Sequence, residues 1–242
     1  MTGGDKQHSD IDNDDELNHL GIDPRIFKED SVAAKLLSIF KNAKRSSYEP
    51  QDIIYHEGAE ADTTFILGNG MVKLLSYLPN GRARIVRLHG PGSIIGISGI
   101  LEPAYEHTAV AVNNVQALKI PVSFIKETKQ KDPETFLEIS EKWHQYLREA
   151  DVWITQFSTG SIRSRVARLI TFLSYLEQET NTEYVQLLTG EEMASILGVT
   201  PESVSRVIAE FKRQKVLQPV NDGPHELYKR DAALLSEYSE DL

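Results

Sequence analysis

Hydrophobic residues in the first half of this chain form short runs separated by glycine, proline and polar residues. These runs follow one another from residue 48 to about residue 124, as in an antiparallel barrel or roll of many short strands. Asn80-Gly81 separates two of them and predicts a hairpin. A short amphipathic segment over 31–40 predicts a helix before the strands. Residues 1–27 lack a sustained apolar period and predict a disordered tail.

Helical spacing replaces this pattern after residue 132. Pro133 begins a long segment that Ser158-Thr159-Gly160 interrupts, so we expect a helix over 133–158 followed by a hinge. Its apolar positions alternate four and three residues apart over about three heptads, as in a coiled-coil seam. The predicted dimer seam comprises Phe136, Ser140, Trp143, Leu147, Ala150, Ile154 and Phe157. We favour a homodimer contact along this seam; the alternative is a helix that packs only on its own β-domain.

Two short helices joined by a glycine turn are predicted within 188–217. Thr189 and Glu192 have the spacing of a capping box at the start of the first helix. Gly198 stands where a left-handed residue ends that helix, and Thr200 caps the second. This pattern predicts a helix-turn-helix.

The second of these helices has an apolar face and a polar face. The apolar face comprises Val204, Val207, Ile208 and Phe211. Glu202, Ser205 and Arg206 fall on the opposite face, and side chains near the start of such a helix reach base edges in the DNA major groove. The predicted DNA-binding residues are Thr200, Glu202, Ser203, Ser205, Arg206 and Lys212. The alternative is a simple exposed ion pair between Glu202 and Arg206.

Two further features complete a winged helix. A helix is expected over 161–178, and two short strands are expected around Asp222-Gly223. The predicted fold is therefore α+β, with an N-terminal antiparallel β-roll, a long dimerisation helix and a C-terminal winged helix-turn-helix. The predicted units are an acidic disordered tail (1–27), a β-roll sensor domain (28–132), the dimerisation helix (133–158), the DNA-binding domain (159–232) and an acidic tail (233–242).

Composition limits the chemistry. The chain has 242 residues and a net charge of −10, which disfavours nonspecific binding to nucleic acid. Basic residues nevertheless cluster around the helix-turn-helix and predict a local basic face. This cluster comprises Arg163, Arg165, Arg168, Arg206, Lys212, Arg213 and Lys215. The absence of cysteine excludes disulfides, thiolate zinc sites and cysteine-ligated iron–sulfur clusters.

Motifs that would indicate an enzyme, a secreted protein or a membrane protein are missing. There is no P-loop, G-x-S-x-G, H-E-x-x-H or His-x-His pair, so we expect neither catalysis nor a metal site. The N-terminus is acidic and polar, and no apolar run has membrane-spanning length. We therefore expect a cytoplasmic protein with no membrane partner.

Three segments resemble the Crp–Fnr family of bacterial transcription regulators. They are YEPQDIIYHEGAEADTTFILGNGMVKLL, SIRSRVARLITFL and LTGEEMASILGVTPESVSRVIAEFKRQKVL. The resemblance covers roughly residues 30–230 and implies a cyclic-nucleotide-binding-like roll, a homodimer, a palindromic operator in double-stranded DNA, and RNA polymerase as a partner. It also implies that a signal in the roll shifts the hinge and reorients the recognition helices.

The recognition helix resembles the Fnr-like branch of that family. Glu202, Ser205 and Arg206 match its glutamate, serine and arginine position for position, whereas Pro201 stands where the cAMP-receptor branch has an arginine. Arg206 is suited to guanine O6 and N7, and Glu202 to cytosine N4. We therefore predict half-sites of the TTGAT type.

The effector-binding segment departs from the cAMP pattern of the family. Ile97 replaces the ribose-binding glutamate, and His107 replaces the phosphate-binding arginine. An apolar side chain accepts nothing from a ribose, and a neutral imidazole offers no permanent charge to a phosphate. We therefore do not expect cAMP binding in the usual mode. The residues predicted to line the effector pocket are Ile97, Ser98, Tyr105, His107 and Thr108.

Several alternatives remain open. The effector is a small acid, a haem or gas, or nothing at all. The candidate haem ligands are His56, His89, His107 and His144. A ligand-binding adaptor without DNA binding is the alternative function. Activation and repression are both compatible with the sequence, because the sign depends on where the operator lies relative to the promoter.

Overall fold

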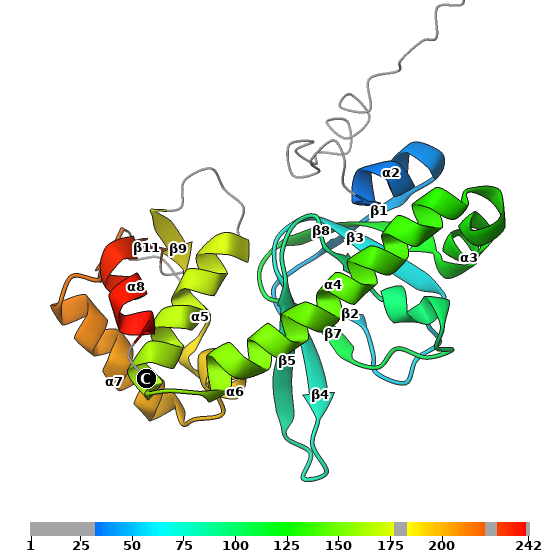
Figure 1. Cartoon of the computed structure of the whole chain (residues 1–242). Helices are drawn as coiled ribbons and strands as arrows, with labels where there is room; N and C mark the ends of the chain where they lie inside the picture. Colours follow the sequence, from blue (N-terminus) through cyan, green and yellow to red (C-terminus); the bar gives the residue numbers. More distant parts are fainter. Residues whose placement is uncertain (1–31, 177–182, 221–226, 241–242) are drawn as a thin grey trace, which may run out of the picture.

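A computed structural model describes residues 32–176, 183–220 and 227–240 (Figure 1). It confirms the predicted α+β architecture: a β-roll, a long helix that crosses it, and a C-terminal helical domain with a small sheet. The predicted N-terminal tail and Asp222-Gly223 lie outside the described residues. Within those residues, no helix has both the length and the apolar character that crossing a membrane requires.

The roll consists of two four-stranded antiparallel sheets, in the orders β1-β8-β3-β6 and β2-β7-β4-β5. Its strands are β1 (Lys44–Tyr48), β2 (Ile53–Tyr55), β3 (Thr63–Asn69), β4 (Val72–Tyr77), β5 (Ala83–His89), β6 (Ile94–Ile95), β7 (Thr108–Ala111) and β8 (Val115–Pro121). The sheets share a core of inward-facing side chains that includes Phe65, Leu67, Val72 and Ala109. The predicted hairpin joins β4 to β5, and Gly81 adopts a φ of 77° in its turn.

Two short helices cover one side of the roll. The first, α2 (Val32–Ile39), agrees with the helix predicted over 31–40. The second, α3 (Val122–Lys131), follows Pro121 directly, whereas the sequence pattern suggested strand to about residue 124. Leu36 and Ile125 are fully buried where these helices pack. A short 3-10 helix, η2 (Ile97–Ile100), follows β6.

The long helix α4 (Pro133–Ser158) has the predicted bounds. The Asp132 side chain caps it by accepting a hydrogen bond from Thr135 N (3.2 Å). Its inner face packs on its own chain, and the Tyr146 hydroxyl accepts a hydrogen bond from Ile94 N (2.9 Å) in the roll. Residues 159–161 connect α4 to the next helix, at the position of the predicted hinge.

The predicted dimer seam divides between two environments. Leu147 and Ile154 are 58% and 62% exposed. Phe157, by contrast, is buried in the core of the C-terminal domain, so its assignment to the seam is wrong. Trp143 packs on the cluster that joins the roll to α2 and α3. The reason is geometric: α4 runs past two folded units, and the apolar residues that face each unit pack into its core.

The C-terminal domain begins with α5 (Ile162–Leu176) and ends with α8 (Ala232–Ser239). Between them lie β9 (Tyr184–Gln186), α6 (Gly190–Leu197), α7 (Pro201–Arg213), β10 (Leu217–Pro219) and β11 (Leu227–Arg230). The predicted wing strands β10 and β11 pair in antiparallel fashion, and β9 joins them as an unpredicted third strand.

Residues 233–239 form most of α8 and not the predicted acidic tail. The Asp231 side chain caps this helix by accepting a hydrogen bond from Leu234 N (3.0 Å). Leu235 is fully buried, and Tyr238 stacks on Phe211 of α7 with ring centres 5.5 Å apart. The apolar residues at helical spacing, and not the acidic residues between them, determine that this segment folds as a helix on the domain core.

Candidate nucleic-acid interface

The helix-turn-helix begins at Thr189, which closes a capping box with Glu192. The Thr189 hydroxyl accepts a hydrogen bond from Glu192 N (3.2 Å), and Glu192 Oε2 accepts one from Thr189 N (3.0 Å). Gly198 ends α6 with a φ of 65°, a left-handed conformation that costs glycine little. Thr200 then caps α7 by accepting a hydrogen bond from Ser203 N (3.3 Å). Both predicted caps and the glycine turn are confirmed.

The predicted reading face of α7 points to solvent. Glu202, Ser205 and Arg206 are all exposed. The opposite face is buried and comprises Val204, Val207 and Phe211. The core therefore fixes the rotation of α7 and leaves these three polar side chains outside it.

The first turn of α7 also positions its charged groups. Arg206 Nη2 donates a hydrogen bond to Ser203 Oγ (3.2 Å), and Ser203 in turn lies 3.2 Å from the Thr200 hydroxyl. A hydrogen bond from its own backbone amide, then one from Thr200 and the charge of Arg206, lower the pKa of Glu202. Glu202 is therefore an ionised acceptor, and Arg206 is a cationic donor one turn away.

The basic surface is smaller than the sequence suggested, because α5 uses its arginines within the chain. Arg163, Arg165 and Arg168 all bind other groups of the protein. Their partners are Glu210 Oε1 (3.3 Å), the Leu197 carbonyl (3.1 Å) and the Gln156 carbonyl (2.9 Å), respectively. These arginines therefore hold α4, α6 and α7 around α5 instead of forming part of a free basic face.

Lys212, a predicted DNA contact, lies at the end of α7 against the wing. Its Nζ is 4.8 Å from the centre of the buried Tyr228 ring on β11, a cation–π distance. The side chain is exposed on its other side. This contact holds Lys212 beside the wing, in the last turn of α7, whereas Glu202 lies in the first turn.

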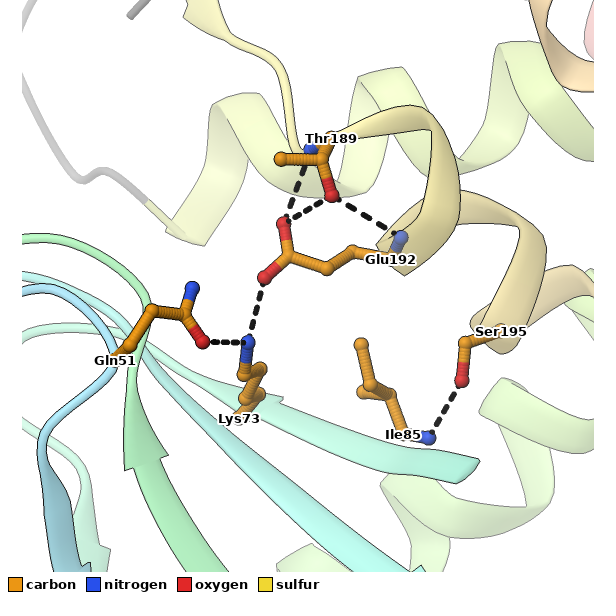
Figure 2. Close-up of polar contacts among 6 residues, drawn as sticks. All are labelled: Gln51, Lys73, Ile85, Thr189, Glu192 and Ser195. Carbon is orange, nitrogen blue, oxygen red and sulfur yellow. Dashed lines mark hydrogen bonds and ion pairs between the residues drawn. The ribbon is translucent and has the colours of Figure 1, made fainter. Parts of the chain in front are cut away.

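The first helix of the motif also contacts the roll (Figure 2). Lys73 Nζ on β4 lies 2.7 Å from Glu192 Oε1 and 3.0 Å from Gln51 Oε1. The side chains of Lys73 and Glu192 are only 8% and 12% exposed, so water screens this ion pair little. Ile85 N on β5 donates a hydrogen bond to Ser195 Oγ (3.0 Å). The sequence around Glu192 indicates only its capping role, because Lys73 lies 119 residues away.

The pKa of Glu192 reflects this arrangement. Burial alone would raise it, but the hydrogen bond and charge of Lys73 and the hydrogen bonds of Thr189 outweigh burial and lower it. The carboxylate is therefore ionised at neutral pH while it holds α6 on the roll.

A second candidate site, which we name the roll cavity, lies between the roll and α4 and has a volume of about 630 Å³. Four of the five predicted effector residues line it, namely Ile97, Ser98, Tyr105 and His107. Thr108 does not: it is buried, and its hydroxyl accepts a hydrogen bond from Glu57 N (3.0 Å). Tyr105 stacks on Tyr55 with ring centres 3.9 Å apart and closes one side of the cavity.

Three basic residues of the roll cavity were not predicted from the sequence. Arg84, Arg87 and His89 all line it from β5. In a regular strand, Arg84 and Arg87 would point to opposite faces of the sheet. Here the register between β4 and β5 shifts by one residue, because Leu74 pairs with Arg87 and Leu75 pairs with Ile85. This bulge puts all three side chains on one face.

The two histidines of the roll cavity are neutral at physiological pH. Burial, then the charges of Arg87, Lys142 and His107, lower the pKa of His89 to about 3. Burial also lowers the pKa of His107, against the opposing carboxylates of Glu106 and Glu57. The other two candidate haem ligands, His56 and His144, are exposed and do not line the cavity.

Comparison with known proteins supports both halves of this description. Residues 45–132 match the cyclic nucleotide-binding domain family, and residues 164–238 match the Crp-like helix-turn-helix domain family. Transcriptional regulator LdrP of Thermus thermophilus is 28% identical over 171 residues, which are 69% of this chain and 84% of LdrP. The cyclic AMP receptor protein of the same organism is 27% identical over 195 residues, which are 80% of this chain and 87% of that protein.

The fold has a close counterpart among solved structures. FixK2 from Bradyrhizobium japonicum superposes with a TM-score of 0.73 at 20% identity, over 83% of this chain and 98% of that one. LdrP is, by its name, a transcriptional regulator. The roll, the long helix and the capped helix-turn-helix thus lead to one conclusion: the chain belongs to the Crp–Fnr family of DNA-binding transcription regulators.

Proposed function

We propose that this regulator acts as a homodimer that reads a palindrome with TTGAT-like half-sites through α7. The observation that carries the proposal is the exposed face of Glu202, Ser205 and Arg206 on a helix whose rotation is fixed by a buried opposite face. Arg206 binds guanine O6 and N7, ionised Glu202 accepts from cytosine N4, and Ser205 contacts a neighbouring base.

The exposed part of α4 supports the homodimer. Leu147 and Ile154, seven residues apart, leave two large apolar side chains in solvent on one helix face. Pairing with the same face of a second copy would bury them. Leu147, Ala150 and Ile154 also line the roll cavity, so that a partner helix would cover its open side.

The roll is proposed to act without cAMP in the usual mode. Ile97 and neutral His107 line the roll cavity at the positions where the family binds ribose and phosphate. Its cationic groups come instead from Arg84 and Arg87 on β5, which suit a small acid. Calorimetric titration with cAMP should show no binding, and purification with added haem should give no Soret band. RNA polymerase is the expected protein partner.

A fluorescence anisotropy assay tests the reading face. Arg206→Ala should weaken binding to a TTGAT palindrome by about 1–3 kcal/mol and remove discrimination against a duplex in which the guanine is replaced. The matched control is Arg45→Ala, an exposed arginine on β1 at the far side of the roll. Equal loss in both variants, or unchanged discrimination in Arg206→Ala, would contradict the assignment.

A further inference from the structure

A second cavity, which we name the hinge cavity, lies where α4 enters the C-terminal domain. It has a volume of about 700 Å³, and its walls come from α4 on one side of the hinge and from α5 and α8 on the other. This size is typical of sites for small organic ligands. No residue of α7 lines the hinge cavity, and neither do Leu147 and Ile154. Arg87 and Trp153 line both this cavity and the roll cavity.

One wall of the hinge cavity is a rigid aromatic corner. The rings of Trp153, Phe157 and Phe172 contact one another edge to face, with centres 4.8, 5.5 and 5.8 Å apart. Val152 and Tyr175 extend this surface and are 58% and 67% exposed, so large apolar groups remain uncovered inside a concave site. Such a surface favours the apolar part of a ligand.

The charged groups of the hinge cavity are mostly cationic, although the chain as a whole is acidic. Four arginines line it, Arg87, Arg148, Arg168 and Arg230, against the single carboxylate of Glu149. Arg168 binds backbone carbonyls at the hinge. Arg148 makes no hydrogen bond or ion pair with any residue that the structure describes. Its guanidinium is thus a free donor beside the aromatic corner.

We propose that the hinge cavity binds a small amphipathic anion, an aryl-substituted carboxylate whose ring lies against Trp153 and Phe172 and whose charge reaches Arg148. The carboxylate is favoured over a neutral polar group because cations outnumber anions in the lining. The ligand would bridge the helix that leaves the roll and the two helices that support the DNA-binding motif, and so stabilise their present arrangement.

Energy transfer from Trp153 tests this proposal in the full chain. In a Trp143→Phe variant, Trp153 is the sole tryptophan, and excitation should transfer to bound 8-anilinonaphthalene-1-sulfonate. 4-Phenylbutyrate should displace this probe at least tenfold more effectively than its uncharged amide. Arg148→Gln should weaken phenylbutyrate about tenfold and leave the amide unchanged, as expected for loss of one charge-assisted hydrogen bond. Arg45→Gln is the matched control.

A cavity-filling variant separates this site from the roll cavity. Ser236 is exposed on α8 and lines the hinge cavity but not the roll cavity. Ser236→Trp should abolish binding of both phenylbutyrate and the amide, measured by calorimetry, while circular dichroism shows an unchanged fold. Equal affinity for acid and amide, insensitivity to Arg148→Gln, or retained binding in Ser236→Trp would each overturn the proposal.

Discussion

The ion pair between Lys73 and Glu192 should control how firmly the DNA-binding domain is held on the roll. Lys73→Met retains the apolar stem of the side chain and removes its charge. Glu192→Gln removes the opposite charge but retains the capping box, because glutamine also serves at this helix position. The two variants therefore perturb the same contact from opposite sides without disturbing either element.

The structure sets the size of the effect. Breaking a buried ion pair by removal of one partner typically costs about 3–5 kcal/mol. In Glu192→Gln, Lys73 keeps Gln51 as a hydrogen-bond partner. In Lys73→Met, Glu192 keeps Thr189. We therefore expect each single variant to lose about 2 kcal/mol of docking free energy, or about 30-fold in the docking equilibrium. The double variant should lose little more than either single one.

Hydrogen exchange at one amide measures docking directly. Ile85 N donates its hydrogen bond across the interface to Ser195 Oγ (3.0 Å), so its exchange reports separation of α6 from β5. Exchange should accelerate about 30-fold in Lys73→Met and in Glu192→Gln. As a control, Lys131→Met removes a pair with Glu127 that is 75% and 55% exposed, and should change exchange less than twofold.

Two results would refute this reasoning. One is unchanged exchange of Ile85 in either single variant, and the other is a double variant whose loss equals the sum of the two. The pH dependence is a further check, since the pKa of Glu192 is lowered in the folded state. The stability that ionised Glu192 contributes is complete above its pKa in the unfolded chain, about 4.3. It is lost as the pH falls through the lower pKa of Glu192 in the folded protein. The difference between wild type and Glu192→Gln should therefore shrink below about pH 4.

Two further predictions concern the dimer and the roll. Leu147→Glu combined with Ile154→Glu should convert the dimer to monomer in analytical ultracentrifugation and abolish operator binding, because both exposed side chains lie in the proposed seam; a dimer in this variant would rule out that seam. The pKa of His89 is about 3 in the folded protein, so between pH 3 and 6.5 the unfolded chain binds a proton that the folded chain does not. Urea denaturation should show a loss of about 2 kcal/mol between pH 7 and pH 5 that His89→Leu removes; an equal loss in that variant would contradict the assignment.

The features that could be predicted from the sequence are those set by neighbours along the chain. The bounds of α4 follow from Pro133 and the break after Ser158, and the helix-turn-helix follows from two threonine caps and Gly198. Each is a local interaction in which the partner lies within about one helical turn. Apolar spacing likewise gave the buried and exposed faces of α7 correctly.

The features that could not be predicted depend on distant partners. Lys73 and Glu192 each have an ordinary local role, and nothing near either residue indicates the other. Arg84 and Arg87 share a face only because of a bulge, which the alternating pattern conceals. For α8 a local signal does exist: Leu234, Leu235 and Tyr238 have helical spacing, although the acidic residues around them are also typical of an exposed tail.

We expect an event in the roll to reach the reading face through α6, because this helix contacts both. Glu192 at the start of α6 binds Lys73 of the roll, and Val204 and Phe211 of α7 share one buried core with α6. A packed core resists deformation, so we expect α6 and α7 to move as one unit. We therefore expect a displacement of the β4–β5 hairpin to rotate α6 and α7 together, and Arg206 with them, without bending the turn at Gly198.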